Sequence, residues 1–327
     1  MNRWLARVAL ILFCLLALPI RSPAPLIYNP VEGWSYEKPG DKRGKWQRTR
    51  AKDQLDVALA AFDAKDYSVA AKAARRTVKV WPLSDYAPQA QYLVGRCYEV
   101  DGKDEKAFNA YQEVLTKYPK IENYPQILDR QFQITTRFLG GKHFLLWGYI
   151  PFFPSMDKTA VMYDKIIKNG PYSEVAPQAQ MNIGAAREKQ DNYPLAVKAY
   201  ERAADRYNDR PEIAAEALYK AGLAYNKEAK TAEYDQNVAG QAIATFTDFM
   251  ALYPSDTRGT QAQQLIAALK TEQARGSFQT AKFYEKNKRW EGALIYYNEV
   301  LLKDPNSDLA PKARERIDTL KKRTGQN

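Results

Sequence analysis

The feature that most constrains this chain is a series of small and aromatic residues at fixed offsets. Between residues 87 and 119 the series is Gly95, Tyr98, Ala107, Tyr111 and Pro119. Small residues at such positions let two antiparallel helices approach closely, and the aromatic side chains fill the space left between them. The proline ends the second helix because it has no N–H and clashes with the preceding turn. These offsets therefore predict a helical hairpin.

The same offsets recur along the chain. Four further units are marked by Ala58, Ala70, Ala74 and Pro82; by Gly184, Ala196 and Tyr200; by Gly222, Ala242, Phe246, Phe249 and Pro254; and by Ala281, Tyr284, Ala293, Tyr297 and Pro305. In the unit that begins at Gly222 the second helix comes late, which predicts a long loop over residues 230–240. We expect Gly95, Gly184 and Gly222 to lie where paired helices touch. This spacing is typical of the tetratricopeptide repeat, in which stacked hairpins form a concave groove.

A sixth hairpin is interrupted by an insert. Segments 127–139 and 156–168 carry apolar residues at helical spacing and flank the sequence GGKHFLLWGYIPFFPS, residues 140–155. A final helix over residues 309–323 is expected to cover the exposed face of the last repeat. We therefore predict an all-α fold, a tetratricopeptide-repeat superhelix of about six helical hairpins with a C-terminal capping helix.

The first 24 residues have the pattern of a secretory export signal. Arg3 and Arg7 precede an uncharged apolar run over residues 8–18. This run is shorter than the roughly 20 residues that span a bilayer as a helix. Cys14 follows a bulky residue that interrupts a lipoprotein cleavage motif, so cleavage, lipidation and retention as an anchor all stay open.

Proline and glycine between residues 25 and 46 predict an extended tether with no fixed structure of its own. A basic cluster at residues 42–50 is either a peripheral contact for anionic headgroups or a solvated linker. The expected organisation is an export signal (1–24), the tether (25–46), N-terminal repeats (47–172) that include the insert (140–155), and C-terminal repeats with the capping helix (173–323).

Composition leaves little material for catalysis. The 327 residues include two Cys and one His, too few for a Cys/His zinc site. His143 has no nucleophile motif beside it, and Cys97 is expected to be buried. A net charge of +11 is mild for this length and does not by itself indicate nucleic acid. We expect no enzyme activity, no cofactor, no metal site and no nucleic-acid partner.

The insert is the candidate partner-binding element. Its large apolar residues lie within ten positions, and Pro151 and Pro154 exclude a regular helix. Such an apolar loop packs on its own repeats, on a partner or at a membrane interface, where Trp and Tyr are favoured. We expect a loop that folds back on neighbouring repeats and leaves part of its apolar surface for docking. The candidate binding residues are Trp147, Tyr149, Phe152 and Phe153.

Residues 242–320 carry features beyond the repeat itself. They are Phe246, Phe249, the pair Tyr253-Pro254, the pair Phe283-Tyr284, Trp290 and the pair Asp304-Pro305. Together with the linker at residues 86–90, these features resemble the BamD family, lipoproteins of the outer-membrane β-barrel assembly machinery. The resemblance extends over about residues 51–320 and is weaker in the middle.

The resemblance implies a non-catalytic periplasmic scaffold on the outer membrane, which binds the barrel-assembly subunit and nascent outer-membrane proteins. Two features depart from the family: the interrupted lipoprotein motif at Cys14, and a middle enlarged by the insert and by an extra unit at residues 176–211. The alternative is therefore a tetratricopeptide adaptor in another cell-envelope complex, in division or secretion.

Overall fold

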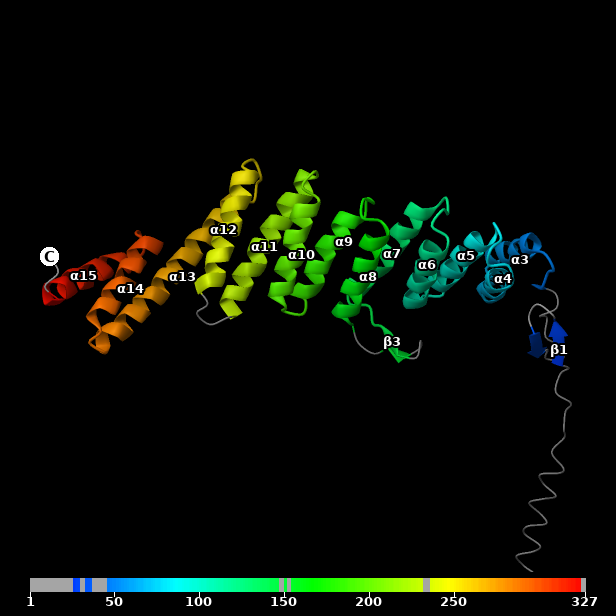
Figure 1. Cartoon of the computed structure of the whole chain (residues 1–327), viewed down its shortest axis with the longest axis horizontal. Helices are drawn as coiled ribbons and strands as arrows, with labels where there is room; N and C mark the ends of the chain where they lie inside the picture. The colour runs from blue at the N-terminus through cyan, green and yellow to red at the C-terminus, as the bar shows by residue number, and fades with distance from the viewer. Residues whose placement is uncertain are drawn as a thin grey trace, which may run out of the picture. The chain divides into compact units, whose positions relative to one another are not determined.

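The computed structural model describes residues 26–29, 33–36, 46–146, 150–151, 154–231 and 236–324. The described residues form thirteen helices, α3 to α15, and two short antiparallel strand pairs. The helices follow one another as antiparallel hairpins (Figure 1), so the predicted all-α tetratricopeptide-repeat fold is confirmed. The chain falls into two compact units, Met1–Tyr124 and Pro125–Asn327, whereas we expected the division between residues 172 and 173.

The first unit contains two of the predicted hairpins. They pair α3 (Ala51–Asp63) with α4 (Tyr67–Val80), and α5 (Ala87–Val100) with α6 (Asp104–Lys117). The predicted small residues Ala58, Ala70 and Ala74 are fully buried where α3 and α4 meet. The Asp66 side chain caps α4 by accepting a hydrogen bond from the backbone N–H of Val69 at 3.1 Å.

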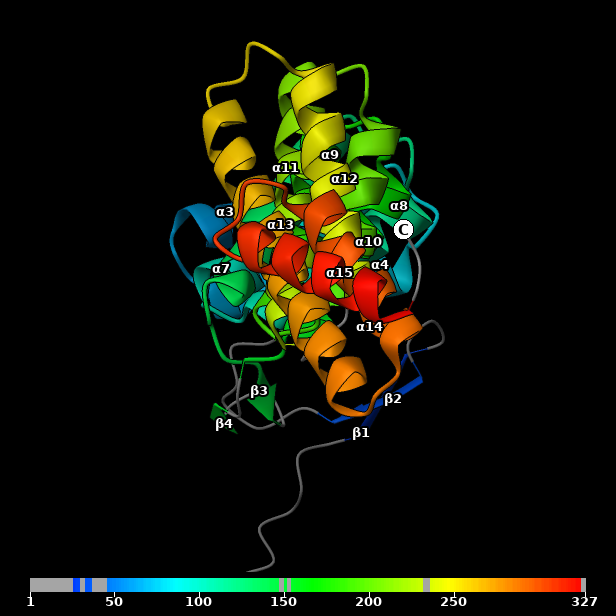
Figure 2. The same cartoon turned by 90° about the vertical axis from the view of Figure 1, so that its left-hand side faces the viewer.

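The second unit contains the remaining hairpins and the predicted capping helix. Its helices are α7 (Tyr124–Leu139), α8 (Met156–Asn169), α9 (Ala176–Glu188), α10 (Tyr193–Arg206), α11 (Pro211–Thr231), α12 (Gln236–Leu252), α13 (Gly259–Lys286), α14 (Trp290–Lys303) and α15 (Ala310–Thr324). Helix α15 lies beside α14 (Figure 2). Ala313, Ile317 and Leu320 of α15 are buried in one cluster with residues of α14. The helix thus covers the last repeat, as expected.

Paired helices touch at the predicted glycines. A Cβ atom added to Gly222 would lie 2.7 Å from the Phe246 ring, closer than real Cβ atoms come. A Cβ at Gly95 would overlap the ring of Tyr111, and one at Gly184 the ring of Tyr200. The repeat register inferred from the sequence is therefore confirmed at all three positions.

The linkers between hairpins repeat one backbone arrangement of two successive turns. In the linker before α5, the Ser84 N–H donates to the Trp81 carbonyl and the Ala87 N–H donates to the Ser84 carbonyl, at 3.1 and 3.0 Å. Equivalent pairs of bonds precede α9, α13 and α15. The linkers before α5, α9, α13 and α15 therefore share the same short connection.

The prediction of a loop over residues 230–240 is wrong in extent, because the connection between the two helices is shorter. Helix α11 continues to Thr231 and α12 begins at Gln236, so the late second helix results from lengthening of both helices. Two causes act together: Ala, Glu and Lys at the end of α11 are strong helix formers, and Val238 and Ala239 are buried in the first turns of α12.

The tether also departs from expectation, because part of it has regular structure. Strand β1 (Leu26–Asn29) pairs antiparallel with β2 (Gly33–Tyr36), and Leu26 lies opposite Tyr36. Branched and aromatic residues favour extended backbone, and Asn, Pro and Gly between them favour a turn. The prediction that the tether has no fixed structure is therefore wrong at these residues.

Candidate functional site

The insert begins with a sharp turn after α7. Gly141 has a φ of 102°, a backbone conformation that favours glycine. Phe144, the first aromatic residue of the insert, is then buried and stacks on Phe138 of α7, with 4.1 Å between ring centroids and 9° between ring planes. The Lys158 ammonium lies 4.9 Å from the Phe144 centroid, within the range of a cation–π contact. The start of the insert is thus folded back on its own hairpin.

Short strands continue the insert on either side of its tip. β3 (Leu145–Leu146) pairs antiparallel with β4 (Ile150–Pro151), and Leu146 lies opposite Ile150. The segment is not helical at its described residues, as the two prolines predict. The candidate binding residues Trp147, Tyr149, Phe152 and Phe153 lie outside the described residues.

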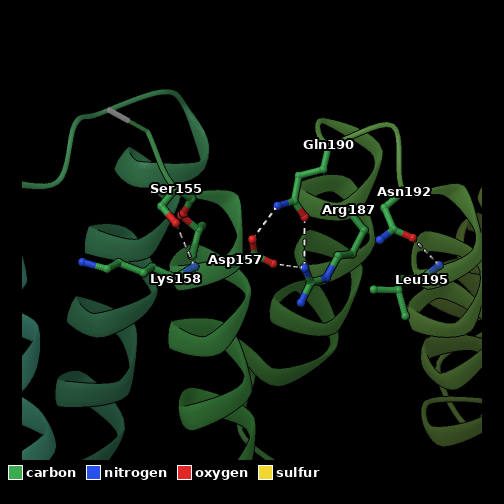
Figure 3. A network of polar contacts seen from close by, with 8 residues as sticks. Ser155, Asp157, Lys158, Arg187, Gln190, Asn192 and Leu195 are labelled. Atoms are coloured by element: carbon green, nitrogen blue, oxygen red, sulfur yellow. Dashed lines mark hydrogen bonds and ion pairs between the residues drawn. The ribbon is translucent and has the colours of Figure 1, made fainter. Parts of the chain in front are cut away.

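The end of α9 and the turn after it contact the residues that flank the insert on both sides. The Lys189 ammonium donates to the carbonyl of Leu139, the last residue of α7, at 2.6 Å. At the other end, Arg187 forms an ion pair with Asp157 in the first turn of α8, and Gln190 Nε2 donates to Asp157 Oδ2 at 2.9 Å (Figure 3). We call Arg187, Lys189, Gln190 and Asp157 the clamp.

The side chains of the clamp also contact one another. Arg187 Nη1 also donates to Gln190 Oε1 at 3.0 Å, so these two side chains hold each other while both contact Asp157. The hydrogen bond from Arg187, and then that from Gln190, lower the pKa of the Asp157 carboxyl below its ordinary value. Ser155 ends the insert by capping α8, with its Oγ accepting from the Lys158 N–H at 3.3 Å (Figure 3).

A further polar contact joins three helices of the second unit. The Tyr163 hydroxyl of α8 lies 3.0 Å from Thr136 Oγ1 of α7, and it accepts from Asn182 Nδ2 of α9 at 3.0 Å. Burial, the largest cause, raises the pKa of Tyr163. The hydroxyl therefore stays protonated at neutral pH and keeps both bonds.

The other residues considered from the sequence show no catalytic geometry. Cys97 is buried, and burial raises the pKa of its thiol to about 11, so it is a protonated apolar residue at neutral pH. His143 is exposed at the surface. Across the described ranges, no group of three or more His, Cys, Asp or Glu side chains is arranged to hold a metal ion. Within those same ranges, no helix has the length and apolar character needed to cross a membrane.

Sequence reasoning missed a second repeated contact, between a tyrosine and a glutamate twelve residues before it. The Tyr111 hydroxyl donates to Glu99 at 2.6 Å, and the Tyr297 hydroxyl donates to Glu285 at 2.7 Å. The pKa of Tyr200 is raised by burial and by its bond to Glu188. The signal for this contact was present, since each glutamate lies four residues after the small residue of its first helix.

Comparison with solved structures finds tetratricopeptide-repeat proteins. The C-terminal part of one such protein from Cytophaga hutchinsonii is 15% identical, with 83% of this chain and 90% of that chain covered and a TM-score of 0.36. A tetratricopeptide repeat protein from Parabacteroides merdae is 14% identical, with 83% and 98% covered and a TM-score of 0.33. PilW, described as a widely conserved type IV pilus biogenesis factor, is 15% identical, with 81% and 99% covered and a TM-score of 0.27.

Sequence families give a more specific result. A tetratricopeptide-repeat family matches residues 55–120, in the first two hairpins. No curated protein sequence matches this chain. The family YfiO, described as outer membrane lipoprotein, matches residues 158–327, more than half of the chain. The resemblance to the BamD family is thereby confirmed, and the chain belongs to this family of outer membrane lipoproteins.

Proposed function

We propose that this protein is a non-catalytic periplasmic scaffold, associated with the outer membrane, that binds partners in outer-membrane β-barrel protein assembly. The observation that carries the proposal is the match of residues 158–327 to the outer membrane lipoprotein family. Arrays of helical hairpins act by presenting extended surfaces to other proteins. The partners proposed are the barrel-assembly subunit, nascent outer-membrane proteins, or both.

We further propose that the insert is the docking element of this scaffold. The matched family segment begins at residue 158, immediately after the insert. The clamp holds the two ends of the insert, and Phe144 anchors its first strand on α7. A loop whose two ends are fixed loses less conformational entropy on binding than a loop with free ends. Trp147, Tyr149, Phe152 and Phe153 are the side chains proposed to contact the partner.

Aromatic residues suit this role for a physical reason. Each large aromatic side chain buries about 150–250 Å² when it is covered, and Trp and Tyr are enriched among the residues that dominate binding energy at interfaces. The peripheral contact of the basic cluster at residues 42–50 with anionic headgroups is a separate part of the proposal. Within that cluster, the Arg50 guanidinium is already bonded to the Asp53 carboxylate.

Affinity purification under mild detergent tests the proposed function. The full chain carries a C-terminal tag and is expressed in a Gram-negative envelope, and the recovered proteins are probed for the barrel-assembly subunit. We expect this subunit to co-purify with the chain and not with an unrelated tagged periplasmic protein. Recovery of division or secretion components without the barrel-assembly subunit would instead identify an adaptor of another envelope complex.

A further inference from the structure

The last repeat contains a cleft that the insert does not involve. It has a volume of about 710 Å³ and lies between α13, α14 and the capping helix α15. Helix α13 is the first helix of the last hairpin, and α15 occupies the place of a next first helix. The first helices of such repeats line the concave side of the array. The cleft is therefore on the side where repeat proteins of this architecture bind extended partners.

Cations dominate the lining of this cleft. Five basic side chains and two carboxylates contribute to it: Lys282, Lys286, Lys312, Arg316, Arg323, Glu285 and Glu315. Glu285 is already neutralised, because it forms an ion pair with Arg316 and accepts a bond from Tyr297. Lys282, Lys286 and Lys312 are exposed and have no ion-pair partner among the described residues. The cleft thus carries an uncompensated positive charge.

The floor of the cleft is aromatic. Phe278 and Tyr297 pack edge to face at 5.4 Å between centroids, and the Arg323 guanidinium lies 4.3 Å from the Trp290 ring centroid on one side of that ring. Tyr297 is buried, whereas Phe278 and Trp290 are half-buried and accessible from the cleft. A ligand that uses both features has to place negative charge at the rim and an apolar side chain on the floor.

Two ion pairs in the second unit join the first helices of neighbouring repeats. Glu188 of α9 accepts from Lys227 of α11 at 3.0 Å. Glu285 of α13 pairs with Arg316 of α15. Lys282, Lys286 and Lys312 of the cleft take part in neither pair.

We infer that this cleft binds an extended, acidic segment of a protein partner, with an aromatic or aliphatic side chain of that segment on the Phe278 and Trp290 floor. Charge complementarity and the recessed aromatic floor carry the inference. A flat layer of anionic headgroups can contact the exposed lysine ammonium groups but not the aromatic floor. A membrane surface would therefore make the charge contacts of the site without its aromatic contacts. The inference deepens the proposed scaffold function by stating the chemistry of one partner segment.

A binding measurement with a defined peptide tests the inference on the full chain. The probe is a fluorescent synthetic peptide of alternating Asp and Glu around a central Phe, and the comparison peptide has Asn and Gln in place of the acids. The cleft variant is Lys282→Glu with Lys312→Glu. The matched control, Lys321→Glu with Lys322→Glu, makes the same charge change on exposed positions of α15 that do not line the cleft. Circular dichroism establishes that both variants are folded.

We expect the acidic peptide to bind the wild-type chain and to bind the cleft variant at least about tenfold more weakly. The control should stay within about threefold, because Lys321 and Lys322 do not line the cleft and interactions of exposed charges are weakened by screening at about 0.15 M salt. Three results would overturn the inference: equal binding of the amide peptide, equal loss in both variants, or binding of phosphatidylglycerol vesicles through the cleft lysines without binding of the peptide. None of these results bears on co-purification with the barrel-assembly subunit, which is measured separately.

Discussion

Two neighbouring hairpins of the second unit are built in different ways. The hairpin of α9 and α10 has a short connection and a glycine–aromatic contact, in which the Tyr200 ring lies directly on Gly184. The hairpin of α7 and α8 has the insert as its connection, and neither helix contains a glycine. Its contact instead consists of Phe132 beside Tyr163, with 5.8 Å between ring centroids, and the bond of Tyr163 to Thr136.

The difference teaches what an insertion requires of a repeat. The closed hairpin has its close glycine–aromatic contact within its own two helices, and α11 adds bonds to Glu188 and Glu201 at its surface. The interrupted hairpin takes part of its stability from the next repeat, through Asn182 on Tyr163 and through the clamp on both ends of the insert. A repeat array can therefore carry a long connection where the following hairpin provides the missing contacts.

The largest expected effect comes from filling the closed contact. Gly184→Leu places a side chain where the Tyr200 ring already lies, and overpacking of this kind costs about 1–3 kcal/mol. Urea unfolding followed by circular dichroism measures it. Gly222→Leu should act in the same direction, because Phe246 occupies the corresponding place.

Gly259→Leu is the matched control for this pair of variants, since nothing lies within 4 Å of a Cβ added at that glycine. Its unfolding midpoint should stay near that of the wild type. An unchanged midpoint for both Gly184→Leu and Gly222→Leu would show that the helices do not pack through these glycines.

A smaller effect is expected in the interrupted hairpin. Tyr163→Phe removes the hydroxyl shared by Thr136 and Asn182, and loss of such neutral hydrogen bonds costs about 1 kcal/mol. Urea unfolding again measures the change. Tyr172→Phe is the control, because Tyr172 is 92% exposed. If both variants unfold at the wild-type midpoint, the interrupted hairpin does not depend on α9 in the way described.

The smallest effect is expected at the clamp, and it depends on pH. The pKa of Asp157 is lowered by Arg187 and Gln190, so its contribution to stability is present above the ordinary aspartate pKa of about 3.9 and is lost as the pH falls through the lowered value. Because Asp157 is exposed, the contribution is below about 1 kcal/mol. Asp157→Asn should therefore be less stable than the wild type at neutral pH, and the gap should close in acid. A gap that is constant from neutral to acidic pH would rule out the ion pair as its source.

The sequence predicts those parts of the fold that depend on local spacing. Gly95 and Tyr111 lie sixteen residues apart in one hairpin, and the contact between them follows from helical geometry. Spacing alone does not distinguish a longer loop from longer helices, which is why the extension of α11 and α12 was predicted as a loop. The strand pair in the tether was not predicted. The proline and glycine content of residues 25–46 favoured an unstructured segment, although two short runs of strand-forming residues lie within it.

The clamp could not be predicted from the sequence for a different reason. Lys189 and Leu139 are fifty residues apart, and the acceptor is a backbone carbonyl that every residue has. Arg and Gln are common on protein surfaces, so Arg187 and Gln190 do not stand out in the sequence. Their role follows from the position of α9 beside the insert. The aromatic composition of the insert, in contrast, was apparent at once and directed attention to this part of the molecule.

The most direct test of the central proposal is partner capture by an insert variant. The insert variant carries Trp147→Ser and Phe153→Ser. The control variant carries Tyr172→Ser and Phe283→Ser, and so loses two aromatic side chains elsewhere in the second unit that are 92% and 65% exposed. We predict that the insert variant keeps its helical circular dichroism but recovers much less of the barrel-assembly subunit, while the control recovers as much as the wild type. Normal recovery by the insert variant would show that the insert is internal packing, and loss of its helical signal would show that it is part of the core; either result would contradict the docking role.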